Sequence, residues 1–302
     1  NDTSCSRFPP LAACGPPEDN MKNLKKTGGR MLFFLPLGLI VLLFECVPLF
    51  GMVTKAFGGD GGFTLDYFRE IIEKPVYQTA VLNSLWVTMT CTIVGLVIDF
   101  FLAMALSRSK GRGKALYLSI LNLTSSFSGL PLSIAFITIL GTAGVFVLAA
   151  QQIGFAPLAN YNLYTMKGMF IVYLYFQIPM GTLLLIPTFE KVRKEWKEAA
   201  RLMNAGSAQF WLKIGIPVMM PGILGTFNML FSNAVAAYAT PYLLVNNNIP
   251  LLPIKVVDMF VGDVRQRPEL GSALSITLLA IVLIEIGLTN LCKKHFEKGT
   301  RS

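Results

Sequence analysis

Six long apolar runs alternate with short polar stretches along the chain, at 31–53, 83–106, 116–148, 168–188, 218–245 and 271–292. Each run reaches the roughly 20 mainly apolar residues that an α-helix needs to cross a bilayer. The pattern therefore predicts an all-α membrane protein with about six transmembrane helices. The third and fifth runs exceed that length and contain Gly and Pro, so we expect them to be kinked, tilted or partly outside the membrane.

The composition agrees with a lipid environment. Only 14% of the residues are charged and 53% are hydrophobic, with a mean hydropathy of +0.57, whereas a soluble domain carries about 25% charged residues. The formal net charge of +9 could indicate a nucleic-acid partner, but the basic residues gather in short clusters between the apolar runs. We therefore expect contact with membrane lipid and none with nucleic acid.

Lys and Arg are distributed unevenly between alternate connections. Eighteen of them lie in 21–30, in 107–115, in 189–217 and after residue 292, and seven lie in the other set of connections. Because cytoplasmic loops carry the excess of Lys and Arg, we expect both termini to be cytoplasmic. An even number of spans agrees with that orientation.

The chain divides into three expected parts. Residues 1–20 are rich in Pro and lack the positive start and apolar core of a signal peptide, so we expect an added, disordered segment without a function ahead of a natural start at Met21. Residues 21–62 should hold the cytoplasmic N-terminus, the first transmembrane helix and the start of the outer loop. Residues 63–302 should form the core domain.

Few residues suited to catalysis or metal binding are present. His295 is the only histidine, and the five cysteines form no C-x-x-C pair. The stretch 109–114 (SKGRGK) only superficially resembles a phosphate-binding loop, and the sequence GxxxxGK followed by Ser or Thr does not occur. We expect no catalytic residues, no metal site and no cofactor, so any ATP-driven process would need a separate ATPase.

The stretch 190–217 (EKVRKEWKEAARLMNAGSAQFWLKIGIP) is patterned rather than merely positive. Residues 190–203 are rich in Glu, Lys, Arg and Ala, which favour a helix. Glu190 with Lys194, and Lys194 with Glu198, are i,i+4 pairs of opposite charge. The apolar face of the expected helix consists of Val192, Trp196, Ala199, Ala200 and Met203.

A turn and a second helix are expected to follow. Residues 204–207 (NAGS) interrupt the helical pattern, Ser207 is a suitable N-cap for a short second helix, and Pro217 ends the unit where the next apolar run begins. We interpret the stretch as a helix–turn–helix on the cytoplasmic surface. An amphipathic helix resting on the membrane would explain Trp196 and the lysines, but neither the turn nor the second helix.

The same stretch resembles the E-A-A-x3-G-x9-I-x-L-P loop of permeases of binding-protein-dependent ABC importers. The matching residues are Glu198, Ala199, Ala200, Ile214 and Pro217. Ile216 stands for the family's Leu, and Asn204 stands for its usual Gly. Asn is the non-Gly residue that best tolerates a left-handed backbone, so we expect the turn to form, although Gly206 offers a second place for it.

The resemblance extends from about Phe63 to the C-terminus. It is closest to permeases of the spermidine/putrescine type, because residues 63–108 are similar to their entry segment and first core helix. It implies a non-enzymatic subunit with the fold of a type I ABC importer permease in a bacterial inner membrane, and a coupling helix between helices 4 and 5. It also implies two copies of an ABC ATPase, a homologous second permease and an extracytoplasmic solute-binding protein as partners.

The resemblance further implies that the ATPase docks on the patterned loop. Glu198 would pair with an Arg of the ATPase, a contact whose geometry favours specificity. The other implied docking residues are Ala199, Ala200, Asn204, Gly206, Ile214 and Pro217.

Polar residues inside the apolar runs are candidates for a translocation pathway. Each of the two acids among them would cost about 2.5–3.5 kcal/mol near the bilayer centre, so such acids usually face protein or water. The set predicts a pathway for a cationic or zwitterionic solute such as a polyamine, while hydrogen bonding between helices explains the same residues and stays open. The candidates are Asp99, Asn228, Ser232, Asn233, Tyr238 and Glu285.

Two other functions fit less well. A secondary transporter or channel would need coupling residues or inverted repeats, and it leaves the patterned loop unexplained. An intramembrane enzyme would need a nucleophile with a base, or a set of metal ligands, within the helices, and no such set is visible in the sequence.

Overall fold

The structure, a computed structural model, describes residues 36–59, 62–245, 248–261 and 266–301. The chain divides into two units, 1–51 and 52–302. The segment expected to be disordered, 1–20, and the expected start at Met21 lie outside the described residues.

The described part of the first unit is an apolar helix. It belongs to the span Pro36–Phe57, in which a π-helical turn, η1 (Leu42–Cys46), precedes α2 (Val47–Phe57). Pro48 gives a physical reason for the wider turn. A proline ring clashes with the carbonyl four residues earlier in an α-helix, and a π turn changes the position of that carbonyl.

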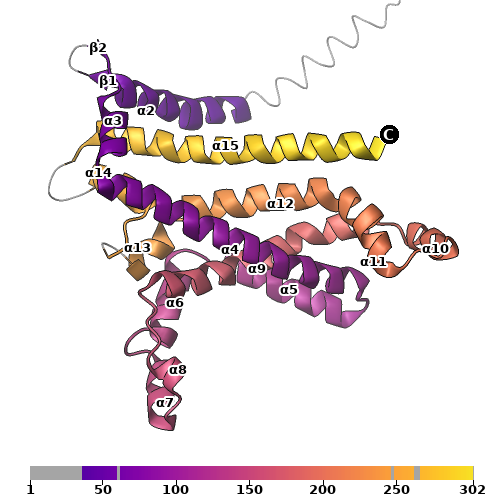
Figure 1. Ribbon diagram of the computed structural model, residues 1–302. Helices are drawn as coiled ribbons and strands as arrows, with labels where there is room; N and C mark the ends of the chain where they lie inside the picture. The colour runs from indigo at the N-terminus through magenta and orange to yellow at the C-terminus, as the bar shows by residue number, and fades with distance from the viewer. Residues whose placement is uncertain (1–35, 60–61, 246–247, 262–265, 302) are drawn as a thin grey trace, which may run out of the picture. The chain divides into compact units, whose positions relative to one another are not determined.

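The second unit is a bundle of long helices joined by shorter ones (Figure 1). A small antiparallel pair of strands, β1 (Gly58–Gly59) and β2 (Gly62–Phe63), leads into α3 (Asp66–Glu73). Helix α4 packs along α9, and α12 packs on α4, α9 and α15. The helices after α3 are α4 (Pro75–Arg108), α5 (Arg112–Ser126), α6 (Leu130–Leu140), α7 (Val145–Ile153), α8 (Ala156–Ala159), α9 (Met166–Glu190), α10 (Lys194–Leu202), α11 (Ser207–Phe210), α12 (Ile216–Ala236), α13 (Ala239–Val245), α14 (Leu252–Val261) and α15 (Pro268–Arg301).

Six helices within the described residues are long and apolar enough to cross a membrane, as the hydrophobic pattern predicts. They cover Pro36–Phe57, Pro75–Arg108, Leu130–Ile153, Met166–Glu190, Ser207–Ala236 and Pro268–Lys294. The third and fifth apolar runs are not single helices. The third is divided into α5, α6 and α7, and the fifth into α12 and α13.

The third run is interrupted by its own hydroxyl and glycine residues. Thr124 Oγ1 donates to the carbonyl of Ile120, four residues earlier, at 2.8 Å, a contact that competes with the helical ladder. Gly129 then has a φ of +72°, a left-handed conformation that glycine adopts without strain. Helix α5 therefore ends at Ser126, and α6 begins at Leu130 in a new direction (Figure 1).

The interruption of the fifth run lies beside that of the third. Helix α12 ends at Ala236 and α13 begins at Ala239. Thr240 Oγ1, on α13, donates to the carbonyl of Gly129 at 3.4 Å, and α13 packs on α6. Non-helical backbone within a membrane needs hydrogen-bond partners inside the protein. Here Thr240, at the second interruption, provides such a partner for the carbonyl of Gly129 at the first.

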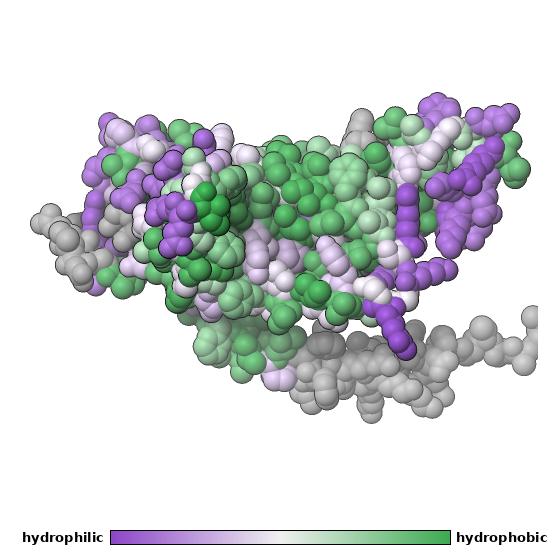
Figure 2. Space-filling model, turned by 90° about the horizontal axis from the view of Figure 1, so that it is seen from below, coloured by the Kyte–Doolittle hydropathy of each residue, from purple (hydrophilic) through white to green (hydrophobic). Residues whose placement is uncertain are grey.

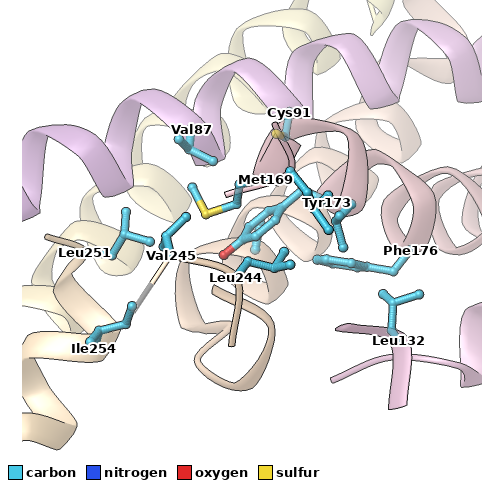
Figure 3. Packing of buried hydrophobic residues seen from close by; sticks show 13 residues of the cluster. Val87, Cys91, Leu132, Met169, Tyr173, Phe176, Leu244, Val245, Leu251 and Ile254 are labelled. Atoms are coloured by element: carbon cyan, nitrogen blue, oxygen red, sulfur yellow. The ribbon is translucent and has the colours of Figure 1, made fainter. Parts of the chain in front are cut away.

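A core of packed side chains lies beside these two interruptions (Figure 3). Helix α9 contributes Met169, Tyr173 and Phe176, and α4 contributes Val87 and Cys91. In lipid, such a core holds helices together by close packing rather than by exclusion of water. The other residues labelled in Figure 3 are Leu132, Leu244, Val245, Leu251 and Ile254.

An ion pair joins α3 to the start of α15. Arg267 donates from both terminal nitrogens to the two carboxylate oxygens of Glu70, each at 2.6 Å, and Lys74 Nζ also contacts this carboxylate at 2.6 Å. The hydrogen bonds from Arg267 lower the pKa of Glu70 from 4.5 to about 2. The pair fixes the segment that precedes α4 against the last span.

Hydrophobic and hydrophilic side chains occupy different zones of the surface. On the face shown in Figure 2, hydrophobic side chains gather in the middle and hydrophilic ones at the two ends. The C-terminal end of α15 lies at the same end of the bundle as α10 and α11 (Figure 1). The basic tail and the basic loop therefore share one side, in agreement with the distribution of Lys and Arg.

Candidate functional site

The patterned loop begins where α9 ends, at Glu190. A short turn at 191–193 follows, so the first loop helix, α10, covers Lys194–Leu202 and is shorter than the expected 190–203. The i,i+4 pairs that the sequence suggested are not among the ion pairs of the described residues. Glu190 instead pairs with Lys114 Nζ of α5 at 3.4 Å, which ties the start of the loop to a neighbouring helix.

The turn after α10 has the left-handed geometry predicted for Asn204. Its φ of +56° is the only positive value at a non-glycine residue in the described part of the chain. Its backbone N–H donates to the carbonyl of Arg201 at 3.0 Å. The prediction that an asparagine makes this turn is confirmed. Gly206, with a φ of −65°, is the N-cap residue of α11, one position before the expected Ser207.

The second helix of the loop is not a separate unit, contrary to expectation. Helix α11 continues through a π-helical turn, η2 (Trp211–Gly215), into α12, so a single span covers Ser207–Ala236. Pro217 lies at the start of α12 and does not end the unit. The wider turn before it accommodates the proline ring, as in the span that contains Pro48.

Exposed apolar side chains gather on one side of the loop. Leu202 and Met203 are 88% and 82% exposed, and Trp196 is 37% exposed. Ala199 is exposed as well, but Ala200 is buried. Ala200 was expected to lie on the outer contact surface, but its side chain is buried. We use the name apolar loop surface for Trp196, Ala199, Leu202 and Met203.

Glu198 lies on the other, charged side of α10. There it lines a cavity of about 650 Å³ between the loop and the ends of α4 and α9. Ile214 is 37% exposed in η2, and Pro217 is half-buried at the start of the membrane helix. The residues expected to form one docking surface are thus distributed over different sides of the loop.

Two of the polar membrane residues meet between α12 and α15. With the Asn228 amide oriented so that its nitrogen faces Glu285, that nitrogen donates to Glu285 Oε1 at 2.8 Å, and the amide oxygen accepts from Thr289 Oγ1 at 3.0 Å. Glu285 is only 6% exposed, and its second carboxylate oxygen has no hydrogen-bond partner among the described residues. Sequence reasoning missed Thr289, although its i,i+4 spacing from Glu285 places both on one helical face.

Asp99 is fully buried between α4 and α9. One carboxylate oxygen accepts a hydrogen bond from Thr182 Oγ1 at 2.9 Å, and the other lies over Gly181, where a Cβ would come within 1.8 Å. One helical turn away, Gln177 Oε1 lies 3.2 Å from the Cβ position of Gly95. Asp99 thus fills the space beside Gly181, and Gln177 fills the space beside Gly95. Because a glycine has no side chain, α4 and α9 can approach each other closely at these positions.

The remaining candidates lie on different faces of the fifth run. Asn233 is exposed, whereas Ser232 and Tyr238 are half-buried. Asn233 continues an exposed stripe with Gly225 and Met229 at i,i+4 spacing, and this stripe is open to contact from outside the chain. Within the described residues, no group of three or more His, Cys, Asp or Glu is placed to hold a metal ion.

Six helices of the described residues that are long enough to cross a membrane, and a basic loop that continues directly into one of them, define an integral membrane protein. The family described as "Binding-protein-dependent transport system inner membrane component" has a model that matches residues 76–302. The chain belongs to this family, and it is the permease subunit of an ABC importer. The family that the loop motif indicated is therefore confirmed.

Relatives of known name share about a quarter of their residues with this chain. The probable sulfate transport system permease protein cysT of Helicosporidium sp. subsp. Simulium jonesii is 23% identical over 247 residues, covering 80% of this chain and 86% of the relative. The spermidine/putrescine transport system permease protein PotB of Escherichia coli (strain K12) is 26% identical over 220 residues, covering 73% and 79%.

The fold is also similar to that of a solved transporter. A crystal structure of a bacterial ABC transporter involved in the import of the acidic polysaccharide alginate contains a chain with a TM-score of 0.71 to this one. The two chains are 16% identical, and the match covers 92% of this chain and 99% of the other. This likeness confirms the type I importer permease fold.

Proposed function

We propose that the chain forms half of the translocation pathway for a small cationic or zwitterionic solute, such as a polyamine, and couples to a separate ATPase through the 190–217 loop. Its partners are two copies of that ATPase, in which ATP is hydrolysed, a homologous second permease and an extracytoplasmic solute-binding protein. One similar structure is described as an alginate ABC transporter in complex with a pentasaccharide-bound periplasmic protein, which supports a binding protein as a partner.

The observation that carries the coupling role is the apolar loop surface. Leu202 and Met203 are almost fully exposed at the end of a charged helix, beside the turn that Asn204 fixes. Burial of apolar surface is favourable by about 25 cal/mol per Å², and adjacent exposed apolar residues mark a site for a protein partner. Because the next helix continues into a membrane span, movement of a docked ATPase would reach the bundle as rigid-body motion.

The proposal places the loop and both termini in the cytoplasm. The basic tail shares one end of the bundle with the basic loop, and the excess of Lys and Arg marks the cytoplasmic side. A cysteine introduced at Ser302, in a chain whose own cysteines are replaced by serine, should react with a membrane-impermeant thiol reagent only after the cells are permeabilised. Labelling in intact cells would contradict this orientation.

Substitutions on the apolar loop surface test the coupling. Leu202→Asp should insert normally into the membrane but lose its ATPase, because the contact would have to bury an unpaired charge. Glu198→Ala should also weaken capture, since truncating one partner of a buried charge pair costs about 2–5 kcal/mol. Gln209→Asp is the matched control, an exposed residue of α11 outside this surface. Normal co-purification of the ATPase with Leu202→Asp would refute the assignment.

The proposed pathway includes the polar membrane residues identified above. The exposed stripe on α12 that carries Asn233 supports a pathway between this chain and the second permease. Glu285, with one unpartnered carboxylate oxygen, and Asp99 favour a cation over an anion. The relatives are named for sulfate, spermidine/putrescine, thiamine and trehalose transport, so solute charge is the property that needs a test.

Competition experiments in cells that carry the chain with its partner subunits provide that test. Excess spermidine should reduce the uptake of labelled putrescine, and sulfate should not. Glu285→Gln should alter uptake at unchanged abundance, because the amide keeps an acceptor for Asn228 while removing the carboxylate. Asp99→Asn should likewise alter uptake. Uptake of sulfate that polyamines do not inhibit would refute the proposed solute class.

A further inference from the structure

The cavity behind α10 is strongly basic. Its walls come from the end of α4 and the residues that follow, the end of α9, α10 itself and the start of the fifth span, and it measures about 650 Å³. Three glutamates line it, against twice as many basic residues. The basic lining residues are Arg108, Lys110, Arg193, Lys194, Lys197 and Arg201.

The six positive charges of the cavity are only partly offset within the described part of the chain. None of the six basic residues takes part in an ion pair there. One of the three glutamates, Glu190, is already paired with Lys114, which does not line the cavity. The cavity therefore has a positive potential that an anion from outside the chain can neutralise.

An aromatic wall holds one of the basic residues in place. The guanidinium carbon of Arg108 lies 5.7 Å from the centroid of the Trp211 ring, a cation–π distance. Trp211 in turn packs against Gly215, where a Cβ would lie 2.4 Å from the ring, and Phe189 and Phe210 lie 6.1 and 5.6 Å from it. Tryptophan beside basic residues at the ends of membrane helices is typical of the head-group region of a bilayer.

We propose that this cavity binds the phosphate of an anionic phospholipid head group. Lys and Arg bind phosphate oxygens through charge-assisted hydrogen bonds, and basic pockets between membrane helices bind anionic head groups. The position favours a lipid over a free phosphate ion, because two of the walls are the ends of membrane spans, α4 and α9. Assignment to the inner leaflet rests on the proposed orientation, whereas the binding itself does not.

A head group in this cavity would support α10 from behind. Charged residues of α10 line the cavity, and none of the residues of the apolar loop surface does. The lipid would therefore hold the loop against the bundle and leave Leu202 and Met203 free to contact a partner.

Trp211 provides a direct probe of binding. The chain has three tryptophans, so Trp86→Phe with Trp196→Phe leaves Trp211 as the only one. The purified full chain in detergent is titrated with short-chain phosphatidylglycerol, short-chain phosphatidylcholine and inorganic phosphate, and Trp211 fluorescence is recorded. We expect a saturable change with phosphatidylglycerol, and a much weaker response to the zwitterionic lipid and to phosphate.

A charge-removal pair tests the site itself. Lys197→Gln with Arg201→Gln removes two lining charges and should weaken phosphatidylglycerol binding about thirtyfold, because each basic residue contributes about a fivefold attraction to an anionic lipid. Lys191→Gln with Lys213→Gln removes two charges of the same loop that do not line the cavity, and should leave binding nearly unchanged.

Other outcomes overturn the proposal. Equal responses to the two lipids would exclude charge recognition, and an equal response to inorganic phosphate would identify a phosphate site without a lipid. Unchanged lipid binding in the Lys197→Gln, Arg201→Gln chain, together with loss of ATPase capture, would assign the cavity to the ATPase. The titration needs no ATPase and no solute, so its failure is distinguishable from failure of the proposed function.

Discussion

The α4–α9 interface buries polar side chains, whereas the 190–217 loop exposes apolar ones. At the interface, Asp99, Gln177 and Thr182 are fully buried and fit against each other or against glycines. In the loop, Leu202 and Met203 are exposed. The chain itself covers these polar groups, although Asp99 Oδ2 and Gln177 Oε1 have no hydrogen-bond partner among the described residues. The loop, in contrast, exposes apolar side chains that only something outside the chain can cover.

The largest expected effect comes from filling a glycine position in the interface. In Gly181→Ala, the new methyl group would lie 1.8 Å from Asp99 Oδ2. Either α4 and α9 must move apart, or the Asp99 side chain must leave its position beside Thr182. Overpacking of this kind costs about 3 kcal/mol. Thermal unfolding in detergent, followed by size-exclusion chromatography, measures the loss.

Gly225→Ala is the matched control for that substitution. No atom lies within 4 Å of a Cβ at Gly225, so the added methyl group should leave stability nearly unchanged. Equal melting temperatures for Gly181→Ala and Gly225→Ala would show that the interface is looser than the contacts of Asp99 indicate.

An intermediate effect on stability is expected at the ion pair of Glu70 with Arg267, between α3 and the start of α15. Here opposite charges pair within the chain, whereas the basic residues that line the cavity behind α10 have no ion-pair partner among the described residues. Because the pKa of Glu70 falls from 4.5 to about 2 on folding, the pair stabilises the protein fully above pH 4.5 and loses its effect as the pH falls towards 2. Glu70→Gln should therefore cost about 2 kcal/mol at neutral pH, with allowance for solvent screening at the partly exposed Arg267.

The pH dependence separates this pair from an ordinary surface contact. The difference in stability between Glu70→Gln and the unaltered chain should shrink as the pH is lowered from 4.5 towards 2. Glu73→Gln removes the exposed pair with Arg69 and should have an effect below about 1 kcal/mol at any pH. A pH-independent difference for Glu70→Gln would argue against the depressed pKa.

The smallest effects are expected at the turn of the loop. Asn204→Gly should be neutral or slightly stabilising, because glycine adopts a positive φ without strain. Asn204→Val should cost about 1–2 kcal/mol, since a β-branched residue at a φ of +56° is strained. ATPase capture by the two variants measures the integrity of the turn, and equal capture would mean that the docked loop does not need it.

Much of the fold could be predicted because membranes impose a simple rule. Twenty apolar residues and an asymmetric distribution of Lys and Arg identify spans without knowledge of packing. The interruptions of the third and fifth runs depend instead on tertiary contacts such as the one from Thr240 to the carbonyl of Gly129. Hydropathy cannot reveal such contacts, although Gly129 and Pro131 indicated that the third run was irregular.

The candidate site was predictable where local backbone geometry decides the outcome. The left-handed turn at Asn204 was predicted from its residue type and its place in the loop motif, with Gly206 as the alternative, and the structure has it at Asn204. The buried position of Ala200 does not follow, because helical periodicity places Ala199 and Ala200 on the same broad face and only the folded loop distinguishes them. The meeting of Asn228 with Glu285 depends on how α12 packs on α15.

The uninterrupted helix from Ser207 into the membrane has a mechanical consequence. At 1.5 Å per residue, Asn228 lies about 30 Å along this rod from the loop. A tilt of about two degrees at the loop end therefore displaces the level of Asn228 by about 1 Å. Because the helix ends at Ala236 and α13 begins at Ala239, the segment beyond can pivot at this interruption, so the helix has the form of a lever whose joint lies beside Gly129.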